Sequence, residues 1–147
     1  MKVKDIAGAL EQFAPLSIQE GWDNSGLCIG APGDEVHGVL VGFDCTPELI
    51  DEAVEKGCDM VITHHPLIFH GLKRIQGGDP VSDAGIKAVR AGDAVYAAHT
   101  TADKVLAGES GAMARLTEDR RSVEKRVKAL NSLKEIRARL VEVRKSL

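Results

Sequence analysis

The sequence predicts an α/β domain with a mainly parallel or mixed sheet flanked by helices, followed by a C-terminal helical tail. Three observations support this prediction. Aromatic residues make up only 3% of the 147 residues, so the core must be built from aliphatic side chains. Short apolar runs alternate with amphipathic stretches of about ten residues, as in βαβ units. From Asp119 onward the pattern changes to a basic sequence with near-heptad apolar spacing.

The first helix and the first two strands are predicted by apolar spacing. Apolar residues from Val3 to Leu10 recur on one face of a helix of about three turns, which ends at Pro15. Apolar runs at residues 27–30 and 39–43 are typical of short strands. Only a short polar link containing Ala-Pro-Gly-Asp separates these runs, and we interpret them as adjacent strands.

A second helix and a third strand follow. Thr46 is suited to cap this helix, Pro47 occupies its first position, and Gly57 ends it. Residues 59–63 then form a short apolar run, which predicts a strand.

A Gly-rich loop leads to a third helix and a fourth strand. The helix is predicted over residues 81–90 and ends at Gly92, and the strand covers residues 94–98. Strands that alternate with helices of about ten residues indicate βαβ units, so a largely parallel sheet is expected.

Residues 119–147 form a basic tail. They carry ten Lys or Arg and four Asp or Glu, a net charge of +6, whereas residues 1–118 carry nine and eighteen, a net charge of −9. An apolar stripe recurs in the tail at Val123, Val127, Leu130, Leu133, Ile136, Leu140, Val143 and Leu147. Ser132 and Glu135 fit a capping box where the phase of the stripe breaks, so the tail is either one long helix or a helical hairpin. We therefore divide the chain into residues 1–118 and 119–147.

Composition and charge exclude several classes of protein. No apolar run approaches the ~18 residues that span a bilayer, so we expect a cytoplasmic protein that binds no membrane. The acidic body is poorly suited to binding nucleic acid. Three widely spaced cysteines without a Cys-x-x-Cys motif indicate reduced thiols rather than a disulfide framework or a thiolate zinc site.

Polar side chains with metal-binding chemistry follow three consecutive strands. His64 and His65 directly follow one strand, and His99 and Asp103 follow the next. Asp44 ends the strand that precedes both. The carboxyl ends of parallel strands form the rim at which ligands bind. The three strand–helix junctions therefore place imidazoles and carboxylates at one edge of the sheet.

The adjacent histidines constrain the backbone. Neighbouring side chains of a strand point to opposite faces, so His64 and His65 could not hold one ion from a regular strand. Pro66 keeps His65 out of the helical region, which places the pair in an extended exit loop. This favours two neighbouring metals, or one metal and a second role, over simple chelation. The residues alone also fit a polar cluster at strand ends without a metal, and Asp44 could instead act as a cap partner for the following helix.

Four segments occur in this order along the chain: Gly21-Trp-Asp-Asn-Ser-Gly-Leu27, Asp44-Cys-Thr-Pro-Glu-Leu-Ile-Asp-Glu-Ala53, Ile62-Thr-His-His-Pro-Leu-Ile-Phe-His-Gly-Leu72 and Tyr96-Ala-Ala-His-Thr100. Together they resemble the successive signatures of the GTP cyclohydrolase I type 2 homologue family, also called NIF-three-like. The resemblance covers about residues 1–116, and its most specific block is Thr-His-His-Pro-Leu-Ile-Phe.

The resemblance implies a metal site and an activity. In the family the paired histidines and a following aspartate ligate a dinuclear divalent-metal centre, and these residues correspond here to His64, His65 and Asp103. His99 would lie near the centre as a supporting or proton-transfer group. The resemblance thus implies a metal-dependent hydrolase of a small-molecule substrate, with one or two zinc, manganese or iron ions. Members form toroidal hexamers, so a homo-oligomer, including a hexamer, is expected.

Two departures from the family pattern matter. Thr101 and Ala102 replace an Asn-Leu pair before Asp103. More seriously, the family takes further ligands from a C-terminal His-x-x-x-Glu, whereas no histidine follows His99 here. The remaining donors would come from a second polypeptide or a neighbouring subunit, or there is no second metal. The alternative to the hydrolase is therefore a catalytically incomplete member that acts as a metal-binding assembly or interaction module.

The tail is expected to contribute to assembly. Its apolar stripe is too long for a small domain to cover, and its positive charge complements the acidic body of another copy. We expect a chain lacking residues 119–147 to have a lower oligomeric mass than the full chain by light scattering. An unchanged oligomeric state would instead favour a basic helix that packs on its own domain.

Overall fold

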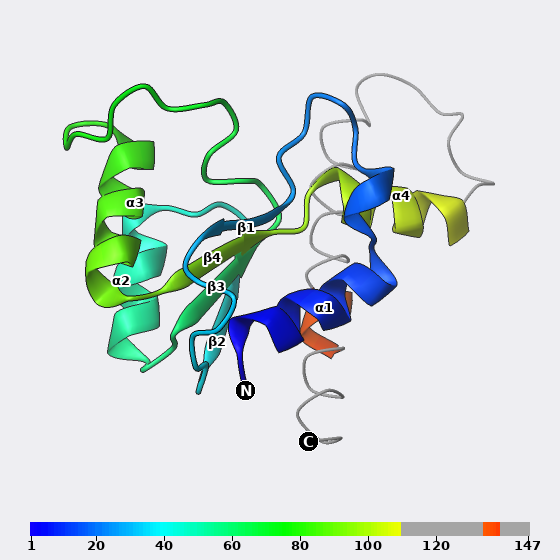
Figure 1. The fold of residues 1–147 in the computed structure, drawn as a ribbon, viewed down its shortest axis with the longest axis horizontal. Coiled ribbons are helices and arrows are strands. Elements are labelled where there is room, and N and C mark those ends of the chain that lie inside the picture. The colour runs from blue at the N-terminus through cyan, green and yellow to red at the C-terminus, as the bar shows by residue number, and fades with distance from the viewer. Residues whose placement is uncertain (110–133, 139–147) are drawn as a thin grey trace.

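The computed structural model describes residues 1–109 and 134–138 of the chain. The expected helix break at Ser132, and most of the apolar stripe of residues 119–147, lie outside the described residues. The described part is a mixed sheet flanked by helices, which confirms the predicted α/β class (Figure 1). Within that part, no helix has the length and apolar character needed to cross a bilayer.

A four-stranded sheet forms the centre of the fold. The strands are β1 (Gly26–Ile29), β2 (Val39–Gly42), β3 (Met60–Thr63) and β4 (Ala94–Ala97). Their spatial order is β1-β4-β3-β2. The neighbours β2 and β3, and β3 and β4, run parallel, whereas β1 runs antiparallel to β4 at one edge. Each of the four strands lies where the apolar runs predict it, to within one residue at its ends.

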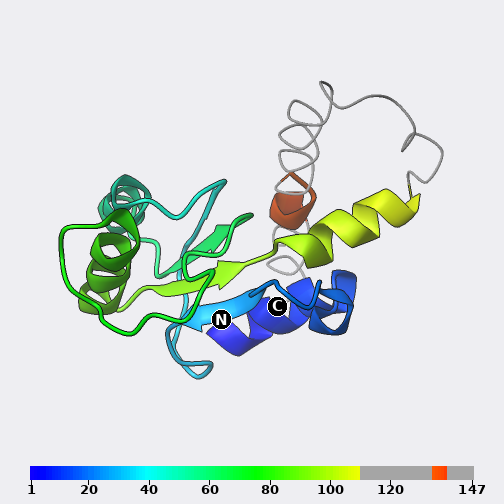
Figure 2. The same ribbon diagram turned by 90° about the horizontal axis from the view of Figure 1, so that it is seen from above.

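Helices cover both faces of this sheet, as Figures 1 and 2 show. The helical elements are α1 (Val3–Phe13), the 3-10 turn η1 (Leu16–Ile18), α2 (Pro47–Glu55), α3 (Pro80–Ala91) and α4 (Thr100–Glu109). Met60 and Ile62 of β3 join the core on the α1 side, and the intervening Val61 joins the core on the α2 and α3 side. Because successive side chains of β3 point to opposite faces of the sheet, this one strand contributes to the apolar layers on both sides.

The predicted helix boundaries have their expected causes. The Thr46 side chain accepts a hydrogen bond from the Leu49 amide at 3.2 Å and caps α2. Gly92 adopts a left-handed conformation with φ of 80° and ends α3, as predicted. Asp79 caps the start of α3 by accepting from the Ser82 amide at 3.0 Å. The helix α4 was not predicted.

The expectation that the first two strands are neighbours is wrong. β1 and β2 lie at opposite edges of the sheet. The link between them follows the N-terminus instead of forming a hairpin: the Val36 amide donates to the Met1 carbonyl at 2.6 Å, and the Val3 amide donates to the Asp34 carbonyl at 3.0 Å. These long-range hydrogen bonds determine the path of the link, although its Pro and Gly residues favour a local turn.

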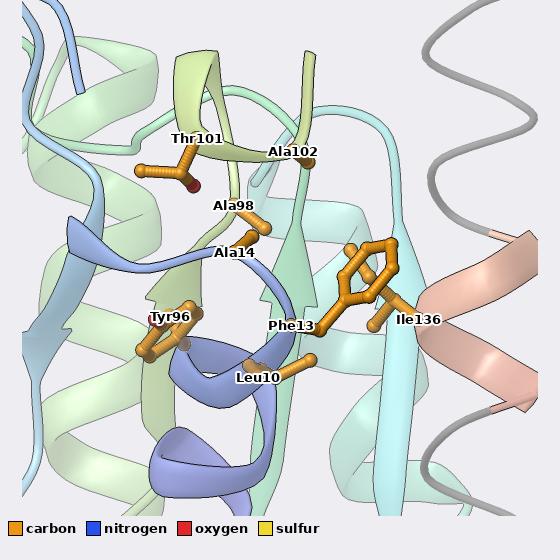
Figure 3. Close-up of a pocket in the computed structure, with 8 residues that line it drawn as sticks. All are labelled: Leu10, Phe13, Ala14, Tyr96, Ala98, Thr101, Ala102 and Ile136. Carbon is orange, nitrogen blue, oxygen red and sulfur yellow. The ribbon is translucent and has the colours of Figure 1, made fainter. Parts of the chain in front are cut away.

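Ile136 belongs to the core of the domain, although it lies far along the sequence. Its side chain is 2% exposed and joins the apolar cluster on the α1 side of the sheet. Figure 3 shows it beside Phe13 of α1, in a pocket that is also lined by Leu10 of α1, Tyr96 of β4 and Ala102 of α4. The segment 134–138 therefore closes a crevice between α1 and α4.

Replacing Ile136 by Ala should destabilise the domain by about 2–5 kcal/mol, because a buried aliphatic side chain is removed from a closed crevice. The neighbouring Arg137 is exposed, so Arg137→Ala should change the free energy of unfolding by less than about 0.5 kcal/mol. Urea unfolding of both variants measures the difference. Equal stabilities would show that the segment 134–138 is not part of the core.

Candidate metal centre

The carboxyl ends of three neighbouring parallel strands carry the candidate site. Asp44 lies two residues after β2, His64 and His65 directly follow β3, and His99 lies two residues after β4. The strand registers align these ends, because Gly42 pairs with Thr63 and Thr63 pairs with Ala97 (residues that end β2, β3 and β4). The predicted rim of imidazoles and carboxylates is therefore present.

The backbone leaves β3 in the way that the adjacent histidines require. The Thr63 hydroxyl donates to the carbonyl of His65 at 2.7 Å, and the His65 amide donates to the carbonyl of Phe43 at 3.1 Å. The pair thus lies in a bend tied to the neighbouring strand end. His64 points inward and is buried, whereas His65 is half-buried.

Three imidazoles converge at this rim. One ring nitrogen from each of His64, His65 and His99 lies within 4.8 Å of the other two. The ring centroids are 4.8 Å apart for His64 and His65, 5.2 Å for His64 and His99, and 5.3 Å for His65 and His99. Asp103 lies at the edge of this group, with Oδ2 3.8 Å from His64 Nε2 and a side chain that is 38% exposed. All four residues singled out from the sequence therefore lie together.

A carboxylate lies within hydrogen-bond distance of Nδ1 in each of two histidine rings. His65 Nδ1 is 2.6 Å from Asp44 Oδ1, and His99 Nδ1 is 2.9 Å from Asp23 Oδ1. An ionised carboxylate only accepts hydrogen bonds, so Nδ1 carries the proton in both rings and the lone pair lies on Nε2. This is the arrangement in which metal-binding histidines are commonly oriented. It also decides the open question about Asp44, which bonds to His65 while Thr46 caps the helix.

Asp23 is a residue that the sequence reasoning missed. Its side chain is fully shielded from solvent, and besides His99 it accepts hydrogen bonds from Ser25 Oγ at 2.7 Å, the Thr100 amide at 3.1 Å and the Thr100 hydroxyl. Burial alone would raise the pKa of Asp23, but the hydrogen bonds from Thr100, His99 and Ser25 outweigh it and hold the pKa at about 2. The only signal in the sequence was its place in the segment 21–27.

His64 is held as a neutral imidazole. Its burial, and then the neighbouring His65 and His99, lower the pKa of His64 to about 4. Its buried Nδ1 has no hydrogen-bond partner among the described residues. Ring nitrogens of His64, His65 and His99 that lie within 4.8 Å of one another can reach a single ion between them. The donor set therefore fits a divalent cation, for which neutral imidazole is a preferred ligand.

The substitution of Asn-Leu by Thr101 and Ala102 leaves Asp103 in place beside the histidines. Both Thr101 and Ala102 are buried in the first turn of α4. The Asp103 amide donates to the His99 carbonyl at 3.2 Å, so Asp103 lies one helical turn after His99.

Comparisons with known proteins identify relatives of the chain. A family model described as Duf34/NIF3 (NGG1p interacting factor 3) matches residues 1–136. The chain is 40% identical over 113 residues to the GTP cyclohydrolase 1 type 2 homolog of Clostridium acetobutylicum, covering 77% of this chain and 42% of that relative. It is 47% identical over 76 residues to the homolog of the same name in Staphylococcus aureus strain COL, covering 52% and 21%.

Solved structures show the same relationship. The crystal structure of Staphylococcus aureus protein SA1388 matches with a TM-score of 0.68 and 40% identity, covering 70% of this chain and 29% of that one. A Bacillus cereus protein related to NIF3 matches with a TM-score of 0.66 and 36% identity, covering 70% and 28%. The chain thus spans less than half the length of these relatives.

Replacing Asp44 by Asn should weaken metal binding roughly 10–100-fold, because the group that orients His65 no longer accepts its proton as a carboxylate. Asp51→Asn makes the same chemical change on α2, where Asp51 pairs with Lys87 of α3, and its metal affinity should equal that of the unchanged chain. Competition with a chelator measures both. Equal affinity of the Asp44 and Asp51 variants would show that Asp44 does not support a metal ligand at His65.

Proposed function

The chain belongs to the Duf34/NIF3 family, and from this membership together with the imidazole cluster at the strand ends we propose that it is a divalent-metal-dependent hydrolase of a small molecule. The observation that carries the proposal is the convergence of His64, His65 and His99 beside Asp103, with carboxylates behind two of the rings. Such a set combines metal donors with groups that can hold a proton, as hydrolysis requires.

We assign His64, His65 and Asp103 as the residues that would hold the ion. Two imidazoles and one carboxylate suit zinc, manganese or iron and leave positions for water and substrate. The 3.8 Å between His64 Nε2 and Asp103 Oδ2 allows both atoms to approach one ion. A divalent cation supplies positive charge that polarises a substrate oxygen and makes water a stronger acid.

His99 is the group that would accept and return the proton. Its Nδ1 is bonded to the buried carboxylate of Asp23, and its ring lies 5.2 Å from the ring of His64 and 5.3 Å from the ring of His65. A carboxylate that stays ionised stabilises the positive charge that His99 gains with a proton, and it keeps the ring in one orientation. Asp44 gives the same support to His65 as a ligand.

A second candidate function is a metal-binding assembly or interaction module. The chain spans about two fifths of the length of the Clostridium acetobutylicum relative. The metal donors that its described residues bring together are three imidazoles and the neighbouring Asp103. A catalytically incomplete member would bind metal through the same residues and serve as an assembly or interaction module, with further donors from a second polypeptide or another copy.

Metal analysis and a hydrolysis assay separate the roles. The full chain should bind about one divalent ion, which His65→Ala and Asp103→Ala should lose and His99→Ala should retain. Hydrolysis of nucleotides, including GTP, with added manganese should fall at least roughly 100-fold in His99→Ala. His37→Ala is the matched control, because His37 is exposed and pairs with Asp59 outside the rim.

Several outcomes would change these assignments. Loss of metal from His99→Ala would make His99 a ligand rather than the proton acceptor. Metal binding without turnover above the Asp103→Ala background would contradict the hydrolase and favour the assembly module. A chain that binds neither zinc nor manganese would contradict both functions.

A further inference from the structure

Two exposed aromatic rings stand beside the imidazole cluster. Trp22 is 58% exposed and Phe69 is 37% exposed. Their ring centroids are 5.8 Å apart, and they lie 5.9 Å and 6.1 Å from the ring of His99. Large aromatic side chains left open to solvent next to a polar site are typical of ligand-binding surfaces rather than of a core.

Hydrogen bonds fix the two rings relative to each other. Trp22 directly precedes Asp23, whose buried carboxylate is bonded to His99 and Thr100. The Asn24 side chain donates to the carbonyl of Ile68 at 2.6 Å, next to Phe69, and so ties the two loops together. The rings are therefore presented on anchored backbone and not on free loop tips.

The shape of the pair suits a single planar ring. The planes of Trp22 and Phe69 are inclined by 43°, so the two side chains do not cover each other as a stacked pair would. A flat ring stacked parallel to the indole would be inclined by 43° to the ring of Phe69 and by 72° to the ring of His99. Aromatic side chains stack on planar bases of any sequence, because every base has a π-face.

We propose that Trp22 and Phe69 form a stacking platform that binds a planar nitrogen-containing aromatic ring, such as a nucleobase, and so selects the substrate class of the adjacent site. This inference rests on the proposed function for the reaction and adds the part of the substrate that is recognised. The platform holds the ring, while the bond to be cleaved extends toward the histidines.

The fluorescence of Trp22 tests the platform directly, because Trp22 is the only tryptophan of the chain. GMP, AMP and UMP are each titrated into the metal-loaded full chain, with excitation at the red edge of the indole absorption. Ribose 5-phosphate serves as the matched ligand that has the sugar and phosphate but no ring. At least one nucleotide should quench the emission saturably and bind roughly fivefold or more tightly than ribose 5-phosphate.

Variants assign the effect to the two rings. By equilibrium dialysis, Trp22→Ala and Phe69→Ala should each weaken nucleotide binding roughly fivefold or more and leave ribose 5-phosphate binding unchanged. Trp22→Phe should restore most of the affinity. Val89→Ala removes an apolar side chain that is 67% exposed on α3, and it should change neither affinity. The metal content of every variant is measured and should equal that of the unchanged chain.

The platform and the hydrolase fail in different ways. Nucleotide binding that depends on Trp22, without turnover, would contradict the hydrolase and support the platform. The platform would be overturned if none of the three nucleotides binds more tightly than ribose 5-phosphate. It would also be overturned if the nucleotide affinity is unchanged in Trp22→Ala. A third outcome would also overturn the platform. If the Trp22 emission shifts to shorter wavelength as the protein concentration rises, without nucleotide, a second copy of the chain covers these rings.

Discussion

The buried carboxylate of Asp23 links the parts of the site that come from distant segments. A carboxylate without partners in this position would cost several kcal/mol, so its burial depends on the donors that surround it. Thr100 and His99 supply them from the chain that follows β4, and the Thr100 hydroxyl in turn accepts the Glu20 amide at 3.0 Å. The same contacts orient the His99 ring, hold the start of α4 and anchor the loop that carries Trp22.

The parallel strands bring the other residues of the site to the same edge of the sheet. Because β2, β3 and β4 end at one edge, short segments separated along the chain bring one acidic and three imidazole side chains together, with Asp103 one helical turn beyond. Asp44 and Asp23 orient rings from behind, burial keeps His64 neutral, and Asp103 remains accessible. Rigid strand ends with supported ligands are the setting in which a metal site can be precise.

Much of the fold follows from local sequence patterns, and the rest depends on distant contacts. Apolar runs and caps such as Thr46 predict the strands and helices, and the rule for parallel sheets predicts that the histidines meet. The place of β1 was mispredicted, because bonds between residues 30–38 and the N-terminus of α1 determine it. Asp23 was missed because its partners lie 76 and 77 residues away. Ile136 joins the core through contacts with residues far from it along the chain, which a local sequence pattern does not reveal.

The proposed function requires that side chains at the ends of these strands hold a divalent ion. X-ray absorption spectroscopy of the zinc-loaded full chain tests it most directly, because the scattering of imidazole rings identifies histidine ligands. We expect a coordination sphere of nitrogen and oxygen atoms with the signature of the His64 and His65 rings. This signature should be lost in the chain in which both histidines are replaced by Ala. A sphere that contains sulfur, or oxygen alone, would contradict it.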